Sequence, residues 1–145
     1  MQALSTAGAG FLLAVLWFDL MFDVQIVGRG DHDTAIASIG TYYRRVTTTA
    51  RPMNRLVALW MVVTVVSLVV QMVRADGNRW MSAMALAFSA TAIGIAAART
   101  VRNAVRLGRG IEDPSTSLRL ARTTLFDHLA SFALMAATLI VVLVN

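Results

Sequence analysis

The chain has 145 residues, of which 57% are hydrophobic, with a mean hydropathy of +0.66, a net charge of +5 and no cysteine. Soluble domains of this size are less apolar, and the absence of cysteine excludes disulfides, thiolate metal sites and cysteine nucleophiles. The positive charge does not indicate a nucleic-acid partner, because the basic residues gather in particular loops.

Four long apolar stretches predict four membrane-spanning helices, over residues 3–24, 53–74, 80–107 and 118–144. Each reaches or approaches the roughly 20 residues that an α-helix needs to cross about 30 Å of hydrocarbon. We therefore expect one all-α domain over residues 1–145, folded as an antiparallel four-helix bundle in the cell membrane. The lipid bilayer is its first expected partner.

The first stretch begins with small residues and ends with acids among aromatic residues, including Asp19 and Asp23. It lacks a basic N-terminal region, so we interpret it as a retained helix rather than a cleaved signal peptide. Asp19 and Asp23 are four residues apart and share one helix face. A turn over residues 28–33 should lead into a short helix, capped by Asp31 or Asp33, that lies at the level of the lipid headgroups.

The second stretch, opened by Pro52, places its polar residues on one inward face. The third predicts the closest helix–helix contact, because small residues recur at spacings of three and four; they are Ala83, Ala87, Ala90, Gly94 and Ala98. Continuing this register from Ala98 places Arg102 inside the bundle. Residues 108–117 resemble a polar loop, so the fourth helix is expected to begin near Leu118.

All 13 basic residues are arginine, and they separate the two sides of the membrane. Eleven of them lie in or beside the loops over residues 28–52 and 99–122, and only Arg74 and Arg79 lie in the remaining loop. The positive-inside rule therefore predicts that both arginine-rich loops are cytoplasmic and that both termini lie outside.

Polar residues from all four predicted helices fall at one depth near the cytoplasmic side. They are Asp19, Asp23, Asn54, Arg55, Arg99, Arg102, Asn103, Asp127 and His128, with the aromatic residues Trp17, Phe18, Phe22, Trp60 and Phe126 nearby. Ionisable groups are costly in hydrocarbon, so they persist there only when they are paired or hydrated.

This cluster has three open interpretations. Ion pairs can lock the helix ends together, with Asp19 and Asp23 pairing with Arg99 or Arg102 and Asp127 pairing with another arginine. The same groups can form a ligand pocket, or they can carry a proton or an ion. A metal site is disfavoured because only one histidine lies in a predicted span and several arginines compete for the acids. We expect no cofactor.

A pocket would assign chemistry to named residues. His128 is the candidate general base, and Asp127 or Asp23 would orient it. Asn103 or Arg102 would stabilise an enolate-like oxygen of the substrate. The aromatic side chains at the same depth would hold a flat ring; these are Trp17, Trp60 and Phe126.

Short motifs along nearly the whole chain resemble the anthrone-oxygenase-like family of small four-helix membrane proteins. They are the glycine- and alanine-rich start, Tyr42-Tyr43-Arg44-Arg45, Arg102-Asn103 in the third helix and Leu125-Phe126-Asp127-His128 in the fourth. The resemblance implies a four-helix bundle that oxidises a polycyclic aromatic or quinone-like molecule without a bound metal, with Asn103, His128 and Tyr43 at its site. The chain departs from the family pattern at Arg106, Thr124 and Ser131, where other residues or spacings are expected.

Three functions follow from these patterns. The first is a bundle that binds, and in one version oxidises, a hydrophobic aromatic molecule. The second is a non-catalytic accessory subunit of a larger membrane complex, whose arginine-rich surface docks an acidic partner or anionic lipid. The third is a dimeric transporter that uses Asp19, although transporter sites usually lie nearer the midplane of the membrane.

Overall fold

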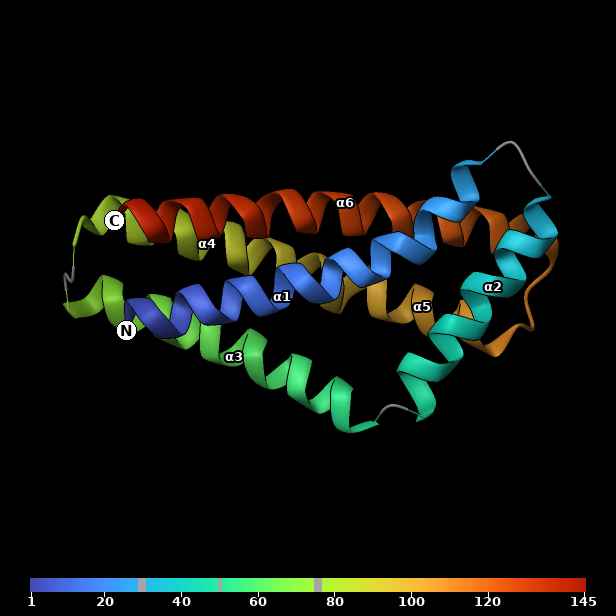
Figure 1. The fold of residues 1–145 in the computed structure, drawn as a ribbon, viewed down its shortest axis with the longest axis horizontal. Coiled ribbons are helices and arrows are strands. Elements are labelled where there is room, and N and C mark those ends of the chain that lie inside the picture. The colour runs from blue at the N-terminus through green and yellow to red at the C-terminus, as the bar shows by residue number, and fades with distance from the viewer. Residues whose placement is uncertain (29–30, 50, 75–76) are drawn as a thin grey trace.

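A computed structural model describes residues 1–28, 31–49, 51–74 and 77–145, which are helical apart from short turns (Figure 1). The elements in chain order are α1 (Gln2–Asp23) with a 3₁₀ extension (Val24–Val27), α2 (His32–Arg44) with a π-helical turn (Arg45–Thr49), α3 (Arg51–Arg74), α4 (Arg79–Ile95), a π-helical turn (Ala96–Thr100), α5 (Val101–Arg109) and α6 (Pro114–Val144). This order confirms the all-α prediction.

Four segments are long and apolar enough to cross a membrane: Gln2–Val27, Pro52–Arg74, Arg79–Arg109 and Pro114–Val144. They form a closed ring in which α1 and α4 each pack against both α3 and α6. Both termini lie at one end of the bundle, where the Gln2 side chain donates to the carbonyl of Val142 at 2.8 Å. At the other end α2 lies obliquely across the bundle and packs mainly against α5 (Figure 1).

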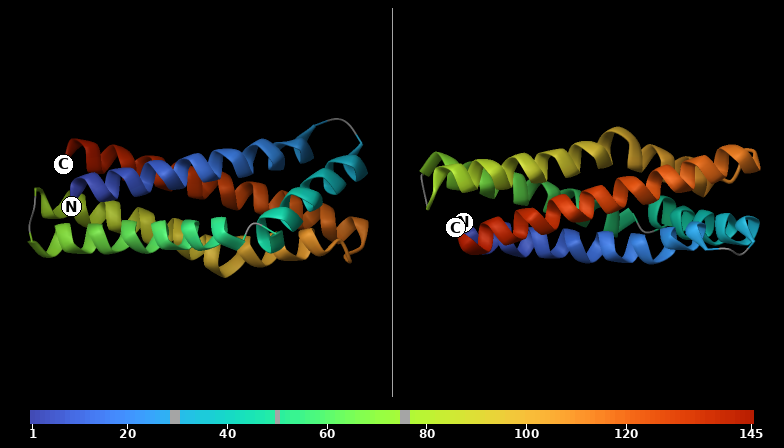
Figure 2. Two further views of the ribbon diagram at one scale, coloured as in Figure 1. Left: turned by 60° about the horizontal axis from the view of Figure 1, so that its bottom comes forward. Right: turned by 90° about the horizontal axis from the view of Figure 1, so that it is seen from above.

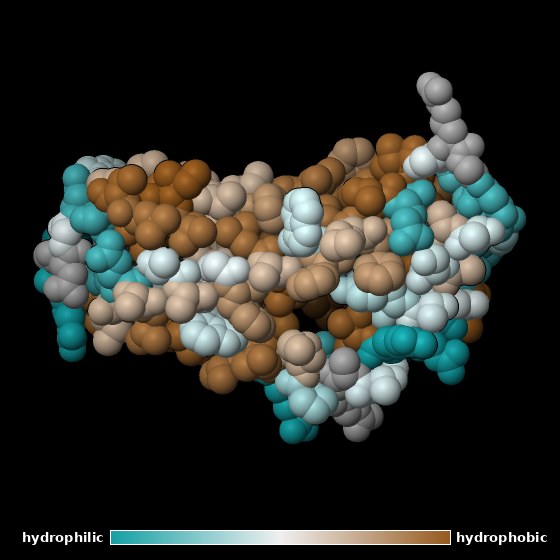
Figure 3. All heavy atoms as spheres, in the orientation of Figure 1, coloured by the Kyte–Doolittle hydropathy of each residue, from teal (hydrophilic) through white to brown (hydrophobic). Residues whose placement is uncertain are grey.

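The interior of the bundle mixes polar and apolar side chains, whereas its outer surface is largely apolar. Buried polar residues join the helices, as where Gln71 donates to Ser5 at 2.8 Å and Ser89 donates to Thr138 at 3.2 Å. Large apolar side chains face outward along every span, and Figure 3 shows a broad hydrophobic band between two hydrophilic ends. Such inward hydrogen bonds and outward apolar surface are typical of membrane bundles, so the chain is a multi-pass membrane protein.

The small-residue stripe predicted for the third span is wrong. Ala87, Ala90, Gly94 and Ala98 are exposed, and a side chain added at Gly94 would have no neighbour within 4 Å. The buried face of α4 is instead Ser82, Ala85, Ser89 and Ala92, against α6. This face is equally small, so the prediction had the right kind of contact on the wrong side of the helix.

The placement of Arg102 inside the bundle is also wrong. The π-helical turn Ala96–Thr100 adds a residue between α4 and α5, and it bends the long helix (Figure 2). A wider turn changes which side chains face inward. Thr100 and Ala104 are buried, whereas Arg102 is exposed and donates to the carbonyl of Ala98 at 2.5 Å.

Helix α6 begins one turn earlier than predicted, at Pro114 rather than near Leu118. Proline suits the first helical position because its missing N–H needs no partner there. Asp113 caps the helix by accepting from the backbone N–H of Thr116 at 2.9 Å. The sequence Asp-Pro-Ser-Thr therefore contains a helix start that the polar-loop interpretation overlooked.

Two glycines bring α2 and α5 into close backbone contact. A Cβ added at Gly40 would lie 3.1 Å from the Leu107 carbonyl oxygen, and one added at Gly108 would lie 2.8 Å from the Arg44 nitrogen. This contact fixes the last turn of α2 beside the bundle. It thereby positions Tyr43, which is buried on the inner face of α2.

Candidate functional site: a buried histidine between two carboxylates

His128 lies between two aspartates of α1 where α1, α2 and α6 meet. Its Nδ1 is 2.6 Å from Asp23 Oδ2, and its Nε2 is 3.7 Å from Asp19 Oδ2. Asp23 and His128 are buried, and the Asp19 side chain is 15% exposed. Both ring nitrogens face carboxylate oxygens, so a doubly protonated imidazole has an acceptor on each side.

Each aspartate also accepts from a tyrosine of α2. Tyr43 donates its hydroxyl to Asp23 Oδ1 at 2.7 Å, and Tyr42 donates to Asp19 Oδ1 at 2.6 Å. The Tyr43 hydroxyl is also 3.5 Å from His128 Nδ1. We call these five side chains, Asp19, Asp23, Tyr42, Tyr43 and His128, the aspartate–histidine network.

The charges of the network do not cancel when both aspartates and His128 are ionised and the tyrosines are neutral. One imidazolium faces two carboxylates, which leaves one negative charge in a buried setting. Such a charge is costly in hydrocarbon, so the network favours taking up one more proton or a hydrogen-bonding partner. The network is therefore suited to holding and exchanging a proton.

Both tyrosines lie outside the candidate spans, and their pKa values are raised. Burial is the largest cause for each; the carboxylates of Asp19 and Asp23 raise the pKa further, because they repel a tyrosinate and accept from its protonated form. Tyr42 and Tyr43 therefore act as proton-bearing donors to the two carboxylates at ordinary pH.

The raised tyrosine pKa values predict that neither tyrosine of the folded protein ionises near pH 10 in an alkaline titration. The chain has only these two tyrosines. The folded state keeps both protons, whereas an unfolded chain loses them near pH 10. The contribution of the two tyrosines to folding stability should thus be fully present below about pH 10 and be lost as the pH rises above it. We expect tyrosinate absorbance to stay flat past pH 10 and then rise together with loss of tertiary structure. A gradual rise around pH 10 in the folded protein would contradict the arrangement.

Asp127 forms a separate pair beside the network. Its Oδ1 accepts from Arg99, which the π-helical turn presents to α6. Among the residues that the structure describes, three buried side-chain oxygens of α6 have no hydrogen-bond partner: Thr124 Oγ1, Asp127 Oδ2 and Ser131 Oγ. Unpartnered buried groups of this kind cost about 1–3 kcal/mol each. This face of α6 therefore has unused hydrogen-bonding capacity next to His128.

The structure brings together Asp19, Asp23, Tyr43 and His128 from the predicted site. The partner that orients His128 is Asp23, and Asp127 pairs with Arg99 instead. Asp19 and Asp23 pair with His128 and the tyrosines, and not with the arginines that the sequence suggested. Among the described contacts, Asn103 has no side-chain hydrogen bond and lies half-buried on α5, outside the network.

The predicted aromatic pocket is not formed by the residues expected. Trp17 and Phe126 are 58% and 67% exposed and face outward. Trp60 packs against Phe11, with ring centroids 5.8 Å apart, and lies close to Gly8 near the other end of α1. Because α1 rises about 1.5 Å per residue, Gly8 is far from Asp19. Trp17 and Phe126 therefore lie on the wrong face for the predicted pocket, and Trp60 lies at the wrong depth.

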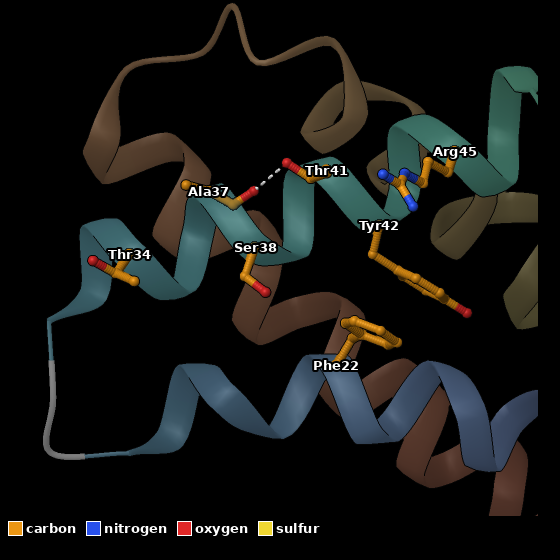
Figure 4. Close-up of a pocket in the computed structure, with 7 residues that line it drawn as sticks. All are labelled: Phe22, Thr34, Ala37, Ser38, Thr41, Tyr42 and Arg45. Atoms are coloured by element: carbon orange, nitrogen blue, oxygen red, sulfur yellow. Dashed lines mark hydrogen bonds between the residues drawn. The ribbon is translucent and has the colours of Figure 1, made fainter.

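A groove of about 530 Å³ adjoins the network between the end of α1 and α2 (Figure 4). Phe22 and Tyr42 stack at one end of it, with ring centroids 4.0 Å apart and an interplanar angle of 9°. The remaining lining residues come from α2 and its π-helical turn: Thr34, Ala37, Ser38, Thr41 and Arg45. The ring of Tyr42 therefore faces the groove, and its hydroxyl faces Asp19.

Tyr42 was not singled out as a site residue from the sequence. The available signal was its place in the Tyr42-Tyr43 pair at the end of the short helix. The side chains of consecutive residues point about 100° apart around a helix. Both tyrosine rings therefore reach the aspartates of α1 only if the edge of α2 that lies between the two side chains packs against α1 and α6. That packing depends on the Gly40 and Gly108 contact, which sequence periodicity does not reveal.

Within the described residues, no group of three or more histidine, cysteine, aspartate or glutamate side chains is arranged to hold a metal ion. No protein-family model, curated protein or solved structure matches this chain. The assignment of a function therefore rests on the geometry of the site.

Proposed function

We propose that this protein binds a flat aromatic molecule of the phenol or quinone class in the groove between α1 and α2, and exchanges a proton with it through the aspartate–histidine network. The observation that carries the proposal is the buried His128 held between two carboxylates. Aspartate and histidine chains at membrane depth are a recurring means of moving protons.

The groove supplies the features that such a molecule needs. The stacked rings of Phe22 and Tyr42 offer an aromatic surface on which a further ring can pack. Arg45 offers a cation for a carbonyl or phenolate oxygen at the groove wall. Asp19 is the more accessible of the two acids of the network, and it accepts from the hydroxyl of Tyr42, whose ring lines the groove. A proton can thus pass between ligand and His128 by way of Tyr42 and Asp19.

The resemblance to the anthrone-oxygenase-like family extends the proposal to oxidation of the bound ring, with dioxygen as the oxidant that takes up the electrons. His128, oriented by Asp23, would then be the base that receives the substrate's proton by way of Tyr42 and Asp19. Of the positions suggested by the resemblance, Tyr43 and His128 lie within 3.5 Å of each other, which supports this extension.

Binding of 1-naphthol at several pH values tests the proposal. We expect the affinity of the protein in lipid nanodiscs to depend on pH, because the ligand exchanges a proton with the network while the phenol itself stays neutral below about pH 8. Asp19→Asn keeps the shape of the side chain but removes one proton-exchanging group, so it should flatten the pH dependence and retain binding. The affinity is followed by naphthol fluorescence.

Asp33→Asn is the matched control, because Asp33 is an exposed acid in the first turn of α2. It should behave as the unmodified protein does. A pH-independent affinity in the unmodified protein, or equal effects of the two substitutions, would defeat the proposal. Failure to bind any aromatic probe, with a protein partner copurifying at fixed stoichiometry, would support the accessory-subunit alternative.

We also propose that the arginine-rich end of the bundle, which carries α2 and α5, faces the cytoplasm. The asymmetry of arginine between the two ends supports this orientation. Because the chain has no cysteine, single cysteines report topology directly. Arg79→Cys, at the end with the termini, should react with an impermeant maleimide in intact cells. Arg109→Cys should react only after permeabilisation; the opposite pattern would reverse the orientation.

A further inference from the structure

A hollow of about 340 Å³, separate from the groove between α1 and α2, lies on the outward face of α6 near the start of that helix. Its lining residues recur at helical spacing on that one helix: Ser115, Leu118, Arg119, Arg122, Thr123 and Phe126. The aspartate–histidine network uses other faces of α6, so this hollow is a separate feature.

Arg119 and Arg122 place two positive charges side by side in the hollow. Residues three apart are neighbours on a helix surface. Within the described residues, neither arginine has a carboxylate within 4.0 Å, whereas Arg99 pairs with Asp127 and Arg106 with Glu112. Two adjacent guanidinium groups match the geometry of a phosphate, which accepts several N–H donors at once.

The position of the hollow along α6 coincides with the edge of the hydrophobic band. Phe126 is 67% exposed, and Leu129 beyond it is 45% exposed on the outward surface of the helix. Arg122 precedes Phe126 by four residues, which is about 6 Å along the helix axis. Arg119 and Arg122 therefore precede the most apolar part of this surface, a position that suits contact with lipid phosphates, and Phe126 and Leu118 flank them with apolar surface.

We propose that Arg119 and Arg122 bind the phosphate of an anionic phospholipid, whose acyl chain packs on Phe126. The charge of the hollow favours an anion over a zwitterion, and its apolar flank favours a lipid over a soluble phosphate. A juxtamembrane arginine contributes about 1 kcal/mol to binding of an anionic surface, which is a factor of about five in affinity.

Native mass spectrometry of the delipidated protein, titrated with phosphatidylglycerol or phosphatidylcholine, tests this site. We expect one phosphatidylglycerol to be retained more tightly than phosphatidylcholine. The double variant Arg119→Gln/Arg122→Gln should weaken phosphatidylglycerol binding by roughly 25-fold, from two such factors of about five, and weaken phosphatidylcholine binding by less, because that lipid has a phosphate but no net charge. Phe126→Ser should weaken binding of both lipids, because it removes the acyl-chain contact.

The matched control is Arg102→Gln/Arg109→Gln, which removes the same charge from two exposed arginines at the same end of the bundle. It should retain preferential phosphatidylglycerol binding. Equal losses in the two double variants would reduce the effect to general surface charge and overturn the site. Equal affinity for both lipids would also overturn it, as would displacement of the lipid by millimolar inorganic phosphate.

Discussion

Replacing His128 with glutamine should destabilise the bundle by about 3–5 kcal/mol, the usual cost of removing one partner of a buried charge pair. Asp23 and Asp19 would be left facing each other without a cation, and Asp23 is fully buried. The glutamine amide can donate to one carboxylate but supplies no charge. Unfolding by titration with a denaturing detergent, followed by tryptophan fluorescence, measures the loss.

Two further variants separate charge from packing. His32→Gln alters the other histidine, which lies at the start of α2, and should change stability by less than about 0.5 kcal/mol, as surface substitutions usually do. Adding Asp23→Asn to His128→Gln should recover part of the loss, because it removes one unpaired charge. If the double variant is no more stable than His128→Gln alone, His128 acts by filling space and the charge argument is wrong.

The spans and the depth of the acids could be predicted from sequence because both depend on position along the chain. Hydrophobic length gave four helices with ends within a few residues of those observed, except at α6. The spacing of Asp19 and Asp23 placed both acids on one face, and the antiparallel arrangement brought them to the level of His128. Topology alone therefore located the core of the candidate site.

Which side chains pair within the site depends on the rotation of each helix about its axis and on how the helices pack. Position along the chain determines neither. The π-helical turn at Ala96–Thr100 decides that Arg99 rather than Arg102 faces α6, and nothing in its alanine-rich sequence marks a wider turn. The inward face of α4 was ambiguous because small residues occupy more than one of its faces. Tyr42 reaches Asp19 only because α2 packs closely against α5.

Gly108→Ala should disturb the site from a distance by separating α2 from α5. The new Cβ would lie 2.8 Å from the Arg44 nitrogen and 3.1 Å from the Tyr43 carbonyl carbon, and backbone atoms cannot rotate away as a side chain can. Overpacking of this kind costs about 1–3 kcal/mol and shifts the backbone. The displaced segment carries Tyr43, so its 2.7 Å hydrogen bond to Asp23 should lengthen or break.

Gly94→Ala provides a matched control within a helix, since an added Cβ there meets nothing within 4 Å. By helix propensity alone both substitutions favour the helix by up to about 1 kcal/mol, so any loss at Gly108 reflects the contact with α2. The alkaline titration supplies the second measurement. In the Gly108→Ala variant, Tyr43 no longer donates to the buried carboxylate of Asp23, so a tyrosine should ionise closer to pH 10 while the protein is still folded. The Gly94→Ala variant should show no such change. If both variants titrate like the unmodified protein, the α2–α5 contact does not hold Tyr43 in the network, and the two structural arguments are independent.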